Sequence, residues 1–218
     1  MTNLSQLLAK DRTLAVVRAE TIPDAAELAK ALGAGGIRVL ELTYTTPNVL
    51  EHVARIASTF EEHGVMIGLG TVLSAEQATA GIDAGAQFLV TPGIREDVAA
   101  VASQRAVPFS LGAMTPTEVA RAIDLGSEIV KIFPARHLGP DYLKDLRGPY
   151  PNLKMLPSGG INEKNAQDFL AAGALAVCCG TSVVPPAAVA AGNWEEITQR
   201  AMLFTSILKA AANPGGAQ

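Results

Sequence analysis

Cysteine, positive charge and long apolar runs are all scarce in this chain. Its only two cysteines, Cys178 and Cys179, are adjacent. Neighbouring cysteines are poorly placed for an ordinary intrachain disulfide, so we expect packed, free thiols and a cytoplasmic location. With 17 basic and 21 acidic residues the net charge is −4, which offers no electrostatic basis for binding nucleic acid. No apolar run has the length of a membrane span, and the N-terminus lacks the pattern of a signal peptide, so no membrane partner is expected.

Metal-ligating residues are also few. The three histidines, His52, His63 and His137, fall in predicted helical or loop segments. None follows a predicted strand with the spacing of a ligand set, and no Cys-x-x-Cys motif occurs. We therefore expect neither a metal site nor a cofactor.

Apolar residues make up 49% of the 218 residues and charged residues only 17%. This balance is typical of a parallel sheet buried on both faces, and it leaves room for an apolar subunit interface. The length lies within the range of a single α/β barrel domain.

Short apolar runs alternate with amphipathic segments along the whole chain. Strands are predicted at 14–18, 37–43, 65–69, 88–91, 108–111, 128–133, 154–157 and 175–179. Helices are predicted at 23–32, 47–62, 75–84, 96–104, 116–125, 140–146, 163–172 and 194–211, with Thr115 as an N-cap before Pro116. Roughly eight such repeats predict one (β/α)₈ barrel domain over 1–212 and a disordered tail over 213–218. A doubly wound open sheet is the alternative.

Lys131 stands out because it lies inside the apolar strand pattern Glu128-Ile-Val-Lys-Ile-Phe-Pro134. Burial disfavours the charged form of a lysine, and a neutral amine is a nucleophile toward carbonyl carbon. Lys131 is therefore a candidate for imine formation. A strand-end lysine that reaches solvent or pairs with an acid is the structural alternative.

Glu41 is a second ionisable residue late in a core strand. Alternation places Ile37, Val39, Glu41 and Thr43 on one face of their strand, and Ile129, Lys131 and Phe133 on one face of theirs. If both faces point inward, the amine and the carboxylate share the barrel mouth and can exchange protons. A purely structural Glu–Lys ion pair is the alternative.

Polar and glycine-rich residues follow the other predicted strands, where the active sites of such barrels lie. Arg18 could hold an anion through its planar fork, or be a solvated charge. The turns Ser158-Gly-Gly160 and Gly180-Thr181 follow the last two strands, where barrels of this class bind phosphate; simple tight turns are the alternative.

Together these motifs resemble the 2-keto-3-deoxy-6-phosphogluconate (KDPG) aldolase family, which includes 4-hydroxy-2-oxoglutarate aldolases. The matching segments are Leu40-Glu-Leu-Thr43, Gly68-Leu-Gly-Thr-Val72, Thr91-Pro-Gly93, Met114-Thr-Pro-Thr-Glu118, Lys131-Ile-Phe-Pro134, Gly148-Pro-Tyr-Pro151 and Pro157-Ser-Gly-Gly-Ile161. They run in the family's order over roughly residues 10–205.

The resemblance implies a homotrimeric barrel that acts as a metal-independent class I aldolase on a small 2-oxo acid. By that resemblance Lys131 forms the imine and Glu41 moves protons. Arg18 and Thr71 would hold the pyruvoyl end, and Pro92 and Phe133 would line the pocket. The distal phosphate would be bound by Ser158, Gly159, Gly160, Gly180 and Thr181.

This chain departs from the commoner family pattern at several positions. It has Tyr44-Thr45-Thr46 where many members carry an arginine just after Glu-x-Thr, Leu111 in place of a proline, and Ser158 in place of a threonine. The resemblance makes KDPG the first expected substrate. Because the missing arginine removes one anion clamp, 4-hydroxy-2-oxoglutarate and an unphosphorylated 2-keto-3-deoxy acid stand as alternatives. Two further readings remain: a phosphate-binding barrel isomerase or synthase without an imine, and a non-catalytic trimeric scaffold or sugar-acid-binding protein.

Overall fold

The structure is a computed structural model that describes residues 3–212, so the predicted tail 213–218 lies outside the described residues. Strands and helices alternate as the sequence predicts. The strands are β1 (Thr13–Val17), β2 (Val39–Thr43), β3 (Met66–Gly70), β4 (Phe88–Val90), β5 (Phe109–Ser110), β6 (Gly112–Ala113), β7 (Ile129–Ile132), β8 (Lys154–Pro157) and β9 (Val177–Cys179).

Most of the helices lie between successive strands. They are α1 (Leu4–Asp11), α2 (Ala25–Ala34), α3 (Val49–Ala57), α4 (Phe60–His63), α5 (Ala75–Asp83), α6 (Glu96–Gln104), α7 (Pro116–Asp124), the 3₁₀ helix η1 (Ala135–His137), α8 (Gly139–Arg147), α9 (Ala166–Ala171), α10 (Pro186–Ala190) and α11 (Trp194–Ala212). The sequence did not predict α1, η1 or α10. None of the described helices is long and apolar enough to cross a membrane.

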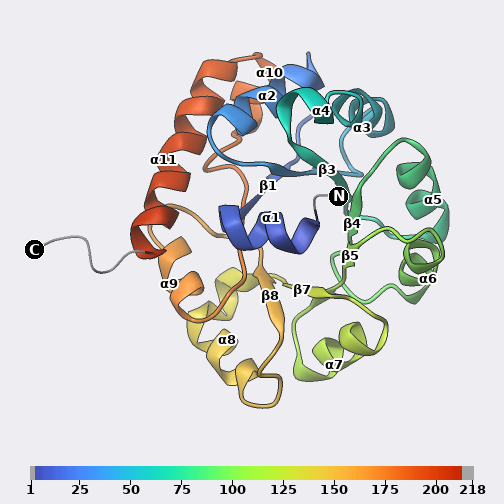
Figure 1. Ribbon diagram of the computed structural model, residues 1–218, viewed down its shortest axis with the longest axis vertical. Helices are drawn as coiled ribbons and strands as arrows, with labels where there is room; N and C mark the ends of the chain where they lie inside the picture. The colour runs from blue at the N-terminus through green and yellow to red at the C-terminus, as the bar shows by residue number, and fades with distance from the viewer. Residues whose placement is uncertain (1–2, 213–218) are drawn as a thin grey trace, which may run out of the picture.

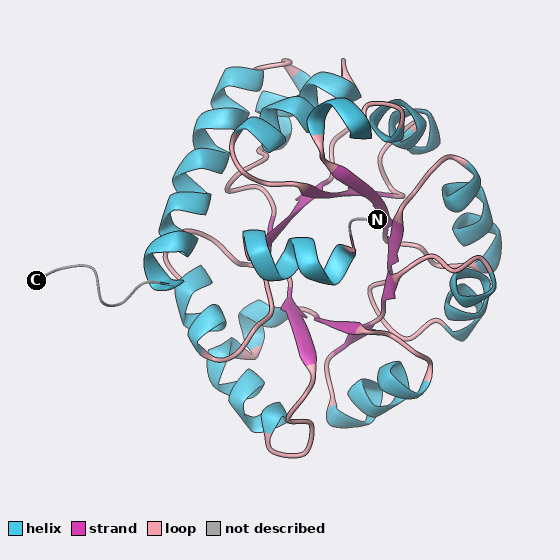
Figure 2. Ribbon diagram, viewed as in Figure 1, coloured by secondary structure: helices cyan, strands magenta, loops and turns pink. Residues whose placement is uncertain are grey.

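All strand pairs are parallel and form two sheets. One has the order β5-β4-β3-β2-β1-β9 and the other the order β6-β7-β8. The strands lie around a common centre, with most of the helices outside them (Figure 2). The predicted strand 108–111 is observed as β5, and the short strand β6 follows beyond the predicted range. Leu111 separates the two, and its amide donates to the Ser127 hydroxyl at 2.9 Å instead of to a neighbouring strand.

Two predicted helices differ from the observed ones for local reasons. The segment 47–62 is divided into α3 and α4, where the Ser58 and Thr59 hydroxyls donate to the carbonyls of Arg55 and Ile56. The predicted helix 163–172 begins only at Ala166. The predicted N-cap at Thr115 is confirmed, with Pro116 in the first turn and a full capping box to Glu118.

The buried residues form two clusters on opposite faces of the strands. The larger lies between the strands and the outer helices. The smaller inner cluster combines inward strand residues such as Val39, Phe88 and Ile129 with Leu4, Leu7 and Leu8 of α1. Helix α1 crosses the middle of the ring of strands (Figure 1).

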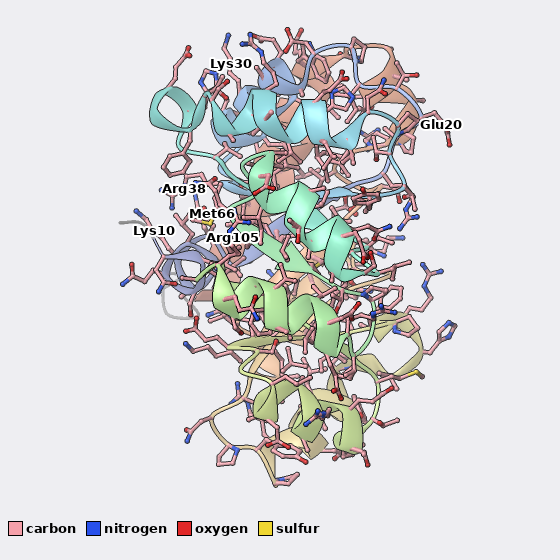
Figure 3. All side chains as sticks on the ribbon, turned by 90° about the vertical axis from the view of Figure 1, so that its right-hand side faces the viewer. Lys10, Glu20, Lys30, Arg38, Met66 and Arg105 are labelled. Carbon is pink, nitrogen blue, oxygen red and sulfur yellow. The ribbon has the colours of Figure 1, made fainter. Side chains whose placement is uncertain are left out.

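The inner cluster is covered by helix α1 at one end of the strands but not at the other (Figure 1). In Figure 3, Lys10 of α1, Arg38 just before β2 and Met66 at the start of β3 lie on one side of the molecule, whereas Glu20, beyond the end of β1, lies on the other. Helix α1 therefore covers the amino ends of the strands, and the opposite end is left to the residues that follow the strands.

Candidate active site

Lys131 and Glu41 meet inside the ring of strands. Lys131 lies on β7 and is 6% exposed, and Glu41 lies on β2 and is 0% exposed. The Lys131 Nζ is 3.8 Å from the Glu41 Oε1. Neither oxygen of the carboxylate has a hydrogen-bond partner among the described residues. A buried carboxylate without donors is costly, so this pair is arranged for something other than the stability of the fold.

Strand alternation explains why both groups point inward. Val39 and Ile129, two residues before Glu41 and Lys131, belong to the inner cluster, whereas Leu40 and Val130 belong to the outer one. The predicted shared face is thereby supported for Val39 and Ile129. It is wrong for Ile37, which packs in the outer cluster because β2 begins only at Val39.

Two glycines make space around this pair. A Cβ at Gly70, on the neighbouring strand β3, would lie 1.8 Å from the Glu41 Oε1. A Cβ at Gly112, which is paired with Lys131 across β6 and β7, would lie 2.3 Å from the main-chain carbonyl of Pro92. Gly70 therefore admits the carboxylate, and Gly112 lets the Thr91-Pro-Gly93 turn approach the strand that carries the lysine.

The surroundings of the Lys131 amine combine an aromatic ring and a thiol. The ring of Phe133, which is 36% exposed, has its centroid 5.4 Å from Nζ, within cation–π range. Cys178 lies in the inner cluster. Burial raises the pKa of the Cys178 thiol to about 12, while Lys131 and a hydrogen bond with Ser158 act in the lowering direction. The thiol is thus a neutral neighbour of the amine at neutral pH.

Arg18 and Thr71 follow the two strands that flank β2, and their side chains contact each other. Arg18 follows β1, Thr71 follows β3, and the Arg18 Nη2 donates to the Thr71 Oγ1 at 3.5 Å. Thr71 has φ 56°, a left-handed conformation that is unusual for a β-branched residue. Backbone strain of this kind clusters at functional sites, because the surrounding structure must enforce it.

The glycine-rich turn after β8 is joined to the segment after β7. The amides of Ala135 and Arg136 donate to the carbonyls of Ser158 and Gly159 at 2.8 and 2.9 Å. Gly159 and Gly160 both have positive φ, and within residues 3–212 their own amides have no hydrogen-bond partner. Those N–H groups are free to donate to an anion.

The remaining predicted site residues are spread along the same end. The Ser158 side chain is buried beside the Cys178 thiol, so it lies deeper than the exposed Gly160. Gly180 lies near the carbonyl of Val16 on β1, and Thr181 after it is exposed. No hydrogen bond or ion pair joins Thr181 to Lys131 or Glu41 in the described part of the chain.

The sequence predicts close backbone access at Gly68-Leu-Gly70, and Gly70 does leave room for Glu41, but two other residues of this region were missed. Cys178 was expected only to pack in the core, although alternation along its strand could have pointed to the site. Arg136 was overlooked because it follows Pro134 outside the strand pattern; a cation directly after the lysine strand was the available signal. No cluster of three or more His, Cys, Asp or Glu side chains suited to a metal ion occurs among the described residues.

Comparisons with known proteins agree with this geometry. A family model described as KDPG and KHG aldolase matches residues 4–200. A 2-dehydro-3-deoxy-phosphogluconate aldolase of Treponema pallidum is 37% identical over 199 residues, covering 91% of this chain and 94% of that protein. A KHG/KDPG aldolase of Escherichia coli is 33% identical over 201 residues, covering 92% and 93%.

A solved structure extends the likeness to three dimensions. The KDPG aldolase of Legionella pneumophila, with pyruvate captured at low pH as a covalent carbinolamine intermediate, has a TM-score of 0.84 and 32% identity. The match covers 92% of this chain and 97% of that one.

Proposed function

The chain belongs to the KDPG and KHG aldolase family and is a carbon–carbon lyase, and from this premise we propose which residues carry the reaction and which substrate they act on. The reaction is a class I, Schiff-base aldol cleavage of a 2-keto-3-deoxy sugar acid to pyruvate and an aldehyde. Lys131 is the nucleophile and Glu41 is the acid–base group. The observation that carries this assignment is the buried amine 3.8 Å from a carboxylate that has no other partner among the described residues.

The first steps need a neutral amine. Glu41 takes a proton from the Lys131 ammonium, and the freed lone pair attacks the C2 carbonyl of the substrate to give a carbinolamine. Glu41 returns a proton to the departing hydroxyl, so that water leaves and a protonated imine remains. Because the pair is shielded from solvent, its electrostatic interactions are stronger than they would be in water.

Cleavage then follows from the charge on the imine. The protonated imine draws the electrons of the C3–C4 bond toward nitrogen while Glu41, directly or through a water, accepts the proton of the C4 hydroxyl. The aldehyde departs and an enamine of pyruvate remains. Protonation of C3 and hydrolysis of the imine release pyruvate and restore the amine of Lys131.

Substrate contacts are proposed along the same end of the strands. Arg18 and Thr71, which are hydrogen-bonded to each other, hold the carboxylate next to the carbonyl. Pro92 and Phe133 line the pocket beside the lysine. The turns Ser158-Gly159-Gly160 and Gly180-Thr181 bind the distal group, with the free amides of the first turn as the supporting observation.

The proposed substrate is KDPG, cleaved reversibly to pyruvate and glyceraldehyde 3-phosphate. Relatives of this chain are named as aldolases of this compound, and the Ser158-Gly159-Gly160 turn offers amides without a partner in residues 3–212 to an anion. The second candidate is 4-hydroxy-2-oxoglutarate, favoured by the name KHG/KDPG aldolase of the Escherichia coli relative. It is also favoured by Tyr44-Thr45-Thr46, which supplies no arginine just after Glu-x-Thr and in which the Thr45 hydroxyl forms a 3.0 Å hydrogen bond with that of Thr43. A panel of KDPG, its unphosphorylated counterpart and 4-hydroxy-2-oxoglutarate separates these substrates by kcat/KM.

We also propose that the two sheets are parts of one (β/α)₈ barrel in a single domain over 1–212. Only Leu111 separates β5 from β6, and the Leu175 amide donates to the Met155 carbonyl of β8 at 2.9 Å, which links the other two edges. A homotrimer in the cytoplasm completes the proposal. The exposed apolar side chains of Leu73 and Met114 support an interface between subunits.

The experiment that tests the assignment is intact-mass measurement after incubation with pyruvate and borohydride, with Lys131→Ala as the comparison. We expect one reduced pyruvate adduct on the wild type, placed on Lys131 by peptide mapping, and none on the variant. No adduct on the wild type would favour an isomerase or synthase without an imine. An adduct without turnover of any 2-oxo acid aldol would favour the binding-protein reading.

A further inference from the structure

The arginine nearest the glycine turn is Arg136, in the 3₁₀ helix η1. Resting on the proposed function, we propose that Arg136 binds the anionic group at the end of the substrate remote from the carbonyl. It would thereby set the preference for a phosphorylated over an uncharged aldehyde half. A terminal phosphate and a terminal carboxylate share the chemistry that a guanidinium recognises.

Two main-chain hydrogen bonds fix the position of Arg136 relative to the Ser158-Gly159-Gly160 turn. Its amide donates to the Gly159 carbonyl at 2.9 Å, and the amide of Ala135 before it donates to Ser158 at 2.8 Å. These two bonds tie the segment that follows the Lys131 strand to the segment that follows β8. The position of the Arg136 Cα is therefore determined by the same turn whose Gly159 and Gly160 amides have no partner in residues 3–212.

The side chain of Arg136 lies across Gly160. A Cβ at Gly160 would be 2.6 Å from the Arg136 Cβ and 3.1 Å from its Nε. Gly160 has φ 84°, so any larger residue would be both strained and in collision with the arginine. The absence of a side chain there leaves room for the Arg136 side chain over the turn.

The Arg136 guanidinium has no competing partner in the part of the chain that the structure describes. Within the described residues Arg136 makes no side-chain hydrogen bond or ion pair, whereas Arg38, Arg95 and Arg121 each pair with a carboxylate. Arg136 is also exposed, so a ligand can reach it. An anion that binds here gains charge-assisted hydrogen bonds without first breaking an existing pair.

Phe133 links this guanidinium to the reacting amine. The ring lies 5.4 Å from the Lys131 Nζ, and an atom of the same ring is 3.2 Å from the position of a Cβ on Gly159. These neighbours form a row that runs from Lys131 to Phe133 and on to Gly159 and Gly160, with the Arg136 side chain over Gly160. A substrate bound covalently at C2 and extending over the ring places its far end at Arg136.

The test compares Arg136→Ala with Arg136→Lys and with the matched control Arg55→Ala. Arg55 is an exposed arginine near the end of α3 that also has no side-chain partner among the described residues. For Arg136→Ala we expect the KM for KDPG to rise about 10- to 100-fold with a smaller change in kcat, the range expected for losing hydrogen bonds to a charged group. The kcat/KM for the unphosphorylated counterpart should stay within about threefold, since only the remote anion is affected.

Further measurements distinguish a bound phosphate from a bound carboxylate and from no role for Arg136. Inorganic phosphate should inhibit the wild type competitively and Arg136→Ala much less, while Arg136→Lys should lie between them and Arg55→Ala should match the wild type. A rise in KM for 4-hydroxy-2-oxoglutarate as large as that for KDPG would identify a carboxylate as an equal ligand. An equal loss on the charged and uncharged substrates, or an unchanged KM for KDPG, would overturn the proposal for Arg136.

The pyruvate–borohydride adduct distinguishes this inference from the function on which it rests. A normal adduct on Lys131 in both wild type and Arg136→Ala shows that the variant is folded and that the imine chemistry is intact. Unchanged discrimination between substrates would then refute only the role of Arg136. A wild type that forms no adduct would refute the proposed function itself.

Discussion

The space left by Gly70 offers a direct test of how Glu41 is positioned. In Gly70→Ala the new Cβ would lie 1.8 Å from the Glu41 Oε1, 2.3 Å from its Cδ and 2.5 Å from its Cγ. The carboxylate must therefore retreat by about 1.5 Å to reach ordinary van der Waals separation. No hydrogen bond from a described residue holds it in place, so this movement costs little beyond overpacking, about 1–3 kcal/mol of unfolding free energy.

The rate of catalysis should also fall steeply, because catalysis depends on where the carboxylate lies. A misplacement of about 1 Å can lower a rate about 100-fold, and positioned acid–base groups contribute about 10²- to 10⁴-fold. We therefore expect kcat for KDPG cleavage to fall at least about 100-fold, or about 2.7 kcal/mol in activation free energy, in an assay of pyruvate release. Gly148→Ala is the control, because Gly148 has helical φ and its nearest contact would be an ordinary 3.4 Å.

A double-mutant comparison shows whether the effect acts through Glu41. In a Glu41→Ala background the atoms that the new Cβ would meet are absent, so Gly70→Ala should lower kcat by less than about threefold further. A kcat within about threefold of wild type for Gly70→Ala alone would refute the assigned position and role of Glu41. The same conclusion would follow if Gly70→Ala lowered kcat by the same factor in the Glu41→Ala background as in the wild type.

Three further predictions concern stability and the thiols. Thr115→Ala removes the capping box with Glu118 and should lower the unfolding free energy in urea by about 1 kcal/mol, with Thr115→Ser restoring most of it; no loss would contradict the cap. Asp11→Asn removes the charge and one of the two acceptors of the 2.6 and 2.8 Å bonds from Arg38 and should cost about 1–3 kcal/mol in the same assay, whereas a change below about 0.5 kcal/mol would show that the pair contributes little. Burial raises the pKa of both adjacent cysteine thiols to about 12 from 9, so iodoacetamide at pH 8 should label them only after unfolding. The unfolded thiols lose their protons first, so the unfolding free energy should fall as pH rises from 9 toward 12; a pH-independent value would contradict the raised pKa.

Local patterns in the sequence were enough to predict most of the architecture and the central pair. Apolar runs of strand length separated by amphipathic segments predict parallel βα repeats, because a strand covered by helices must be apolar on both faces. Lys131 and Glu41 were recognisable because an ionisable residue inside such a run has to be explained by its chemistry. The Thr115 cap was predictable because capping depends on residues within four positions of each other.

Tertiary structure decided what depends on neighbours distant in sequence. The break at Leu111 follows from a hydroxyl on Ser127, and the true face of Ile37 follows from where β2 begins, which alternation alone does not state. The 3.8 Å separation of Lys131 from Glu41 depends on the curvature of the sheets and on the room left by Gly70.

The arrangement of Arg136 over Gly160 joins two segments that follow different strands, so no local pattern could reveal it. The sequence by itself therefore determined the repeating α/β pattern and the reactive residue types. Only the folded chain decided their distances and partners, because these are set by contacts between residues that are far apart in the sequence.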